Sequence, residues 1–270
     1  MPASFRQRTV DELTIEDERS FRHVALYADL KEVLQRAKYP FRVLPPALEG
    51  RADRALLLNL TFWGADAGGD VLESETLPAD VVAHAAWHHL AAKAIPHQGK
   101  PSPAALFLGE AIASAFDVYL VGRLLGHAPN SSFLETQVPA MAEATEAAGL
   151  DEDGFEAMLE AIASDPERAF ADLRELLFDA TSALHACTDV DQATAALAKL
   201  DGHRFASLLH RYELSNWVLY AHAYGSAVEG GERGERDESA ERARTIDAAL
   251  RSAELPLEWL VREWVTPALR

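Results

Sequence analysis

The chain has 270 residues, which is enough to bury a sizeable core and excludes the very small disulfide-rich scaffolds. It carries 25 Lys and Arg against 43 Asp and Glu, and the resulting formal charge of −18 repels nucleic acid and anionic membranes. We therefore expect neither as a partner. The single cysteine, Cys187, cannot form an internal disulfide or a cysteine-rich metal site, so any bound metal would need His, Asp or Glu ligands.

Composition also bears on fold class and location. Apolar residues make up 49% of the chain, and the dense Ala, Leu and Glu usage favours helices over sheets. We find neither the apolar core of a secretory signal nor an uninterrupted apolar run long enough for a membrane span. Together with the lone cysteine, this predicts a cytoplasmic protein. The expected fold is mainly α, in a single domain covering residues 1–270, with a small N-terminal β element.

Residues 1–75 are expected to hold one helix and two short strands. Apolar residues recur every three or four positions over residues 10–39, which predicts one long or broken amphipathic helix. Residues 41–46 and 55–63 are short apolar runs bounded by Pro and Gly, a pattern typical of strands.

The remainder of the chain is expected to be helical. In residues 76–128, Thr76 is a plausible N-cap for a helix that runs to residue 95, and a second helix covers 103–125 and ends at Gly126. In residues 129–270 we expect helices at 133–148, 151–163, 167–186, 191–200, 205–228, 240–253 and 257–264. The charged, glycine-bearing run 229–239 is typical of a mobile loop.

The two helices of residues 76–128 carry the most informative side chains. His84 and His88 are four residues apart, so a helix places both rings on one face, where they can converge on one cation. Glu110 interrupts an apolar, small-residue stretch, and burying its charge without a partner would cost several kcal/mol. His84, His88 and Glu110 then form a metal-binding set with an open position, and Asp117, two turns after Glu110, is placed to orient a histidine.

This arrangement resembles the active site of the gluzincin branch of the zincin metallopeptidases, the group that includes thermolysin. That family has a strand lining the substrate cleft, a helix bearing His-Glu-x-x-His, and a later helix supplying a glutamate ligand. The stretch from His84 to His88 looks like the first helix, and the Gly-Glu-Ala-Ile-Ala-Ser stretch around Glu110 looks like the second. Residues 56–63 would be the strand. The resemblance covers roughly residues 55–126 and implies zinc as cofactor.

The chain departs from the family at the catalytic base. The glutamate that follows the first histidine is Ala85 here, and a methyl group cannot move a proton. The family tends to place an aspartate four residues after the glutamate ligand, where this chain has Ser114. Three interpretations are open for Ala85: a relative that lost proteolysis, a protein with different chemistry, or an engineered replacement that silences the enzyme.

Other residues offer weaker candidates. His89 points about 100° away from His88 on the helix, which favours a packing role or contact with a ligand histidine from behind. His210, His222 and Tyr224 lie in an apolar helical stretch and are weak candidates to stabilise an oxyanion near a metal.

Two other functions compete with a zinc metallopeptidase-like protein that lacks its base. One is a helical binding or scaffold module without metal, with a peptide or protein as its ligand. The other is a non-haem iron protein, because two histidines and one carboxylate also suit Fe(II).

Overall fold

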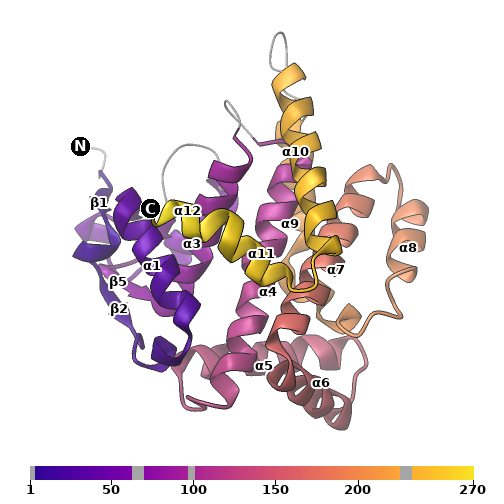
Figure 1. Cartoon of the computed structure of the whole chain (residues 1–270), viewed down its shortest axis with the longest axis horizontal. Helices are drawn as coiled ribbons and strands as arrows, with labels where there is room; N and C mark the ends of the chain where they lie inside the picture. The colour runs from indigo at the N-terminus through magenta and orange to yellow at the C-terminus, as the bar shows by residue number, and fades with distance from the viewer. Residues whose placement is uncertain (1–3, 63–69, 97–100, 226–232) are drawn as a thin grey trace.

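The central element of the fold is helix α4 (Pro103–Leu125), which is buried along almost its whole length while other helices pack around it (Figure 1). The computed structural model describes residues 4–62, 70–96, 101–225 and 233–270, and only the backbone of 60–62, 224–225 and 233–237. Gly126 ends α4, as the sequence predicted, and Ser102 caps its start by accepting a hydrogen bond from the Ala105 amide. The fold is mainly α, which confirms the expected class.

Helix α4 is also long and apolar enough to cross a membrane, with a mean hydropathy of 1.6 over its best window. The sequence predicted this helix but not that it would be long and apolar enough for a membrane span. However, 83% of that window is buried inside the protein, which is equally the property of a core helix. The hydropathy of α4 is therefore weak evidence for a membrane span.

Short strands form two small sheets beside the helices. In the first sheet β3 (Phe41–Val43) lies between β1 (Arg6–Arg8), to which it is antiparallel, and β4 (Val71–Leu72), to which it is parallel. In the second, β2 (Thr14–Glu16) pairs in parallel with β5 (Thr76–Pro78), with Ile15 opposite Leu77. Around them lie helix α1 (Ala25–Ala37) and three single turns, η1 (Val10–Glu12), η2 (Ser20–His23) and η3 (Pro46–Leu48).

Three sequence-based expectations for this N-terminal part were wrong. The helix expected over 10–39 is only α1, because residues 14–16 pair with β5 instead of continuing a helix. The strand expected over 55–63 is helix α2 (Ala52–Phe62): its Ala and Leu residues favour a helix, and a short apolar run cannot distinguish the two states. Thr76 lies in β5 and is not an N-cap, so helix α3 (Ala79–Ala94) begins after Pro78.

The C-terminal half consists of helices, as expected, with boundaries close to those predicted. They are α5 (Ser132–Ala147), α6 (Glu152–Ser164), α7 (Pro166–Ala186), α8 (Val190–Ala198), η4 (Ala206–Tyr212), α9 (Leu214–Gly225), α10 (Arg233–Ser252), α11 (Pro256–Leu260), the π-turn η5 (Val261–Val265) and α12 (Thr266–Ala268). The last elements return toward the N-terminal part, where η5 contacts α1 and α3 (Figure 1).

Two expectations in this half need correction. The single helix expected over 205–228 is divided into η4 and α9, because Glu213 adopts a left-handed conformation with φ of 50°. The loop expected over 229–239 is helical from Arg233 onward, where Glu, Arg and Asp alternate and good helix formers outnumber the single glycine. Residues 229–232 of that loop lie outside the described part of the chain.

Small residues let neighbouring helices approach α4 closely. A Cβ atom added to Gly109 would lie 3.5 Å from the Cβ of Ala91 on α3 and 4.0 Å from Nδ1 of His88. At Gly122 an added Cβ would come within 2.5 Å of the Ile162 carbonyl oxygen on α6, so only glycine fits there. The close packing of α3 on α4 is what brings the polar side chains of these two helices together.

Candidate metal centre

Helix α3 presents two histidines on one face. The ring centroids of His84 and His88 lie 4.9 Å apart, as their four-residue spacing predicts. Their side chains are 30% and 29% exposed, whereas the neighbouring Ala85 and Ala86 are fully buried. The two imidazoles therefore stand at the edge of the core, accessible to a small solute from one side.

Helix α4 contributes a buried carboxylate opposite these rings. Glu110 is only 5% exposed, and its Oε1 lies 3.3 Å from Nε2 of His88. One ligand atom from each of His84, His88 and Glu110 can be chosen so that all three lie within 4.8 Å of one another. The sequence predicted this set, and the structure brings its three members together from two helices.

The donor set and its spacing fit a divalent metal ion. Two imidazole nitrogens and one carboxylate oxygen are the ligands of many zinc sites, in which each lies about 2.0–2.2 Å from the ion. Donors of a tetrahedral site are therefore about 3.4 Å apart, so the present arrangement, with its ligand atoms within 4.8 Å of one another, needs a contraction of at most about 1.4 Å between any two of them. Small side-chain rotations supply that much movement, since both histidines are partly exposed.

Asp117 stands behind His84, where the sequence analysis expected a carboxylate to orient a histidine. Its Oδ2 lies 3.5 Å from Nδ1 of His84, two turns along α4 from Glu110. A carboxylate on one ring nitrogen fixes the tautomer and ring orientation and leaves the other nitrogen for a metal. Of the two histidines, His84 thus has Asp117 as its partner and His88 has Glu110.

The electrostatic surroundings of the two histidines differ. Burial lowers the pKa of His84, but Asp117, Glu110 and Asp70 outweigh it and raise that pKa to about 9. Burial and the neighbouring His84 lower the pKa of His88 to about 3. These opposite shifts favour a protonated His84 and a neutral His88 at neutral pH, and the neutral form of an imidazole is the one that binds a metal.

Carboxylates surround the centre on its other sides. Burial, together with the charge of Asp117, raises the pKa of Asp80 to about 6, although His84 acts in the opposite direction. Asp80 lies one turn before His84 on α3, so a helix places the two side chains on the same face. Burial likewise raises the pKa of Asp70, against the influence of His84. The centre is therefore a site where a further positive charge would be favoured.

Position 85, which carries the general base in the zincin family, belongs to the hydrophobic core. Ala85 has no exposed surface and packs among the buried residues of α3 and α4. The next candidate, His89, packs edge-on against Tyr39 with ring centroids 5.5 Å apart. Burial and Lys93 lower the pKa of His89 to about 4, and among the described residues its Nε2 has no hydrogen-bond partner. The structure thus gives His89 a packing contact with an aromatic ring.

The three weak oxyanion candidates are not part of the group of ligand atoms. His210 is exposed in η4. His222 on α9 stacks on His185 of α7, with ring centroids 4.5 Å apart. The side chain of Tyr224 lies outside the described residues.

Sequence reasoning missed two residues near the centre. Asp70 follows the segment 63–69 and precedes a two-residue strand, so no periodic pattern pointed to it. Tyr212 ends η4, and the charge of Asp117 contributes, after burial, to raising its pKa. Because η4 is far from α4 in the sequence, only the packing of the helices could reveal this proximity.

Searches of protein-family models, curated proteins and solved structures give no match to this chain. The interpretation of the centre therefore depends on the geometry and chemistry of its own residues.

Proposed function

We propose that this chain is a zinc-binding protein with a metallopeptidase-like ligand set, His84, His88 and Glu110, and without the peptidase's general base. The observation that carries the proposal is the convergence of three ligand atoms within 4.8 Å from two separate helices. The burial of Glu110 supports it, because an ionised carboxylate in the core needs a positive partner. In such a set zinc supplies Lewis-acid activation of a water molecule or a carbonyl group.

The protein's own residues account for selectivity and orientation at this centre. Glu110 supplies the negative charge, and the contact of Asp117 with Nδ1 of His84 leaves Nε2 of that ring for the ion. Three protein ligands leave an open position for a further ligand, as in catalytic rather than structural zinc sites.

Two features argue that the centre does not perform peptidase chemistry by the zincin route. Ala85 is buried, and the segment expected to provide the cleft strand is helix α2. Exposed Leu56 and Leu57 of α2 do not provide the row of backbone donors and acceptors that an extended peptide pairs with.

Metal analysis of untagged protein tests the proposal. After dialysis against equal concentrations of zinc and ferrous iron under anaerobic conditions, we expect about one zinc per chain. Glu110→Gln and His88→Ala should lose it, while Glu135→Gln, which changes an exposed glutamate on α5, should retain it. Preferential loading of iron would instead identify a non-haem iron centre, because the same donors suit Fe(II). Absence of both metals would favour the metal-free binding module.

A substitution at position 85 tests the resemblance to peptidases. We expect Ala85→Glu to lower stability by several kcal/mol, because it places a carboxylate in a fully buried position. We expect the Ala85→Glu variant not to cleave a denatured protein substrate. Ala85→Val, which adds an apolar side chain at the same position, is the matched control. Zinc-dependent cleavage by Ala85→Glu that Glu110→Gln abolishes would instead establish a silenced zincin peptidase.

A further inference from the structure

A groove lies where α6 meets the segment before η4. Its residues come later in the chain than those of the metal centre. Its volume is 610 Å³, within the range of about 300–1,000 Å³ that is typical of ligand sites. The lining is mostly small or apolar, and consists of Ala148, Gly149, Leu150, Gly154, Ala157, Met158, Ala161, Asp201, His203, Arg204, Phe205, Ala206 and Ser207.

Small residues explain why the space exists. Gly154, Ala157 and Ala161 follow one another at helical spacing, so Met158 is the only large side chain that α6 contributes to the lining. Met158 and Phe205, both buried, form apolar parts of its lining. A helix of another chain can approach such a face closely, with its apolar side chains filling the groove.

The rim of the groove is acidic. Asp153, Glu156 and Glu160 are exposed and form a stripe on α6 directly beside the small-residue face. Among the described residues none of these three takes part in an ion pair, whereas Glu167 at the start of α7 pairs with Arg123. The sequence contains no Lys or Arg at all between Arg123 and Arg168. The negative charge on this flank is therefore not neutralised by the chain itself.

The basic groups of the opposite wall are already engaged. Arg204 forms an ion pair with Asp172 at 2.9 Å, and its guanidinium carbon lies 4.4 Å from the centroid of the Phe205 ring. Burial lowers the pKa of His203, and its Nδ1 accepts a hydrogen bond from the Phe205 amide. Asp201 adds a further carboxylate to this wall.

We propose that this groove is the docking site for a basic amphipathic helix of a partner protein, whose apolar side chains enter the groove while its Lys or Arg residues face the acidic stripe. Charge complementarity selects this occupant, since an acidic peptide would be repelled and an uncharged one would leave the three carboxylates without partners. The site is independent of the metal centre.

A synthetic Leu–Lys peptide of about five helical turns, with leucines on one face, is the probe. Binding is followed by fluorescence anisotropy of the labelled peptide at several salt concentrations. A peptide of the same composition in scrambled order is the peptide control. We expect the amphipathic peptide to bind at least about 10-fold more tightly than the scrambled one, with affinity that falls as salt rises.

Two variants locate the interaction. Ala157→Trp fills the groove, and because Ala157 is exposed, the fold should accept it; Ala163→Trp, exposed on another face of α6, is its control. The triple change Asp153→Asn, Glu156→Gln and Glu160→Gln removes the stripe, and the same change at Glu135, Glu254 and Glu258 is its control. We expect each groove variant to weaken binding by about 10-fold or more, with no change in either control.

Several results would overturn the proposal. Equal affinity for the scrambled peptide, or no effect of Ala157→Trp, would show that the acidic surface attracts cations without a defined site. Absence of peptide binding would exclude a basic helix as the occupant. Self-association of the chain that Ala157→Trp abolishes would assign the groove to a second copy, and binding of small apolar compounds alone would make it a small-molecule site.

Discussion

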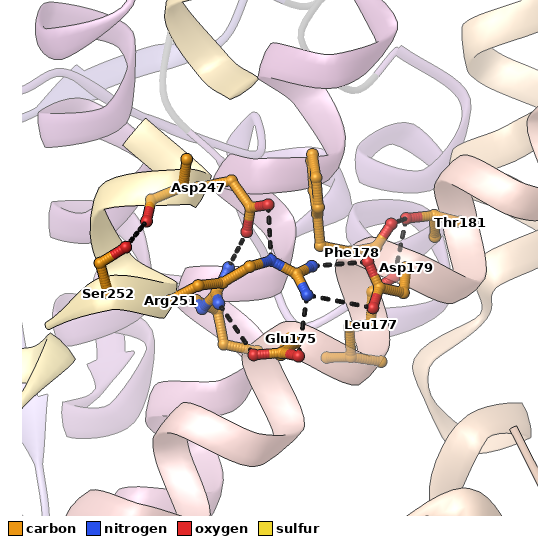
Figure 2. Close-up of polar contacts among 10 residues, drawn as sticks. Glu175, Leu177, Phe178, Asp179, Thr181, Asp247, Arg251 and Ser252 are labelled. Atoms are coloured by element: carbon orange, nitrogen blue, oxygen red, sulfur yellow. Dashed lines mark hydrogen bonds and ion pairs between the residues drawn. The ribbon is translucent and has the colours of Figure 1, made fainter. Parts of the chain in front are cut away.

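Two clusters of charged side chains lie between helices of this protein, and they are neutralised in different ways. Between α7 and α10, Arg174 is almost completely buried and forms an ion pair with Asp247. Figure 2 shows Arg251 of α10 between Asp247 and Asp179. Its guanidinium nitrogens lie 2.8 Å from a carboxylate oxygen of Asp247, 2.5 Å from one of Asp179 and 2.8 Å from one of Glu175. Here each of the three carboxylates contacts a permanently charged guanidinium.

Between α3 and α4 the described partners of the carboxylates are histidines. Glu110 contacts His88 and Asp117 contacts His84, and Asp80 lies on the same side of α3. An imidazole is a titratable cation and a metal ligand, whereas a guanidinium is neither. The carboxylates between α7 and α10 therefore have fixed positive partners in the chain itself, while those between α3 and α4 gain a positive partner only when a histidine is protonated or a metal ion binds.

The largest expected effect comes from breaking the α7–α10 network. Asp247→Ala leaves the buried charge of Arg174 without its partner, so we expect a loss of about 3–5 kcal/mol in the free energy of unfolding. Glu175→Ala removes a partly exposed partner and should cost less than about 1 kcal/mol. Urea denaturation measures both, and equal losses would show that burial of Arg174 is not what makes this cluster essential.

Zinc should stabilise the protein through the other cluster. At a free zinc concentration of about 100 times Kd, linkage predicts about 2.7 kcal/mol, or a rise of about 5–10 °C in the melting temperature. Glu110→Gln should abolish the rise, whereas Glu175→Ala should preserve it, since it alters only the arginine network. A zinc-induced rise that persists in Glu110→Gln would place the binding site elsewhere.

The smallest expected effect is on the pH dependence of zinc binding, which tests the role of Asp117 beside His84. Zinc must displace the proton from His84, whose pKa is raised to about 9, so apparent affinity should fall about 10-fold for each pH unit below that value. Asp117→Asn removes a main cause of the raised pKa and should shift this dependence to lower pH. It should also weaken zinc binding by about 10–100-fold at high pH, because His84 loses the group that orients it. Isothermal titration at several pH values measures both, and identical pH profiles would contradict the role of Asp117.

The parts of the fold that the sequence predicted correctly are those with a long run of apolar residues at helical spacing. The helix at 103–125 was predicted with the boundaries that the structure has, because Pro103 and Gly126 mark its ends and most residues between them are apolar. The N-terminal part was not, since strands of two or three residues leave no periodic signal and residues 52–62 fit a helix or a strand equally well.

The same limit applies to the candidate centre. His84 and His88 were identified because they lie four residues apart in one predicted helix, and Glu110 because it is a charged residue in an otherwise apolar stretch. Asp70 was not identified, because its place beside His84 depends on how a short strand packs near α3. The groove beside α6 also depends on tertiary packing, since Phe205 and Met158 are distant in the sequence.

The most direct test of the central claim is the position of the metal itself. Crystals grown with zinc and measured at its absorption edge should show one anomalous peak on this chain. We expect that peak about 2.0–2.2 Å from one nitrogen of His84, one nitrogen of His88 and a carboxylate oxygen of Glu110. A fully occupied peak elsewhere, or no peak between α3 and α4, would contradict the account.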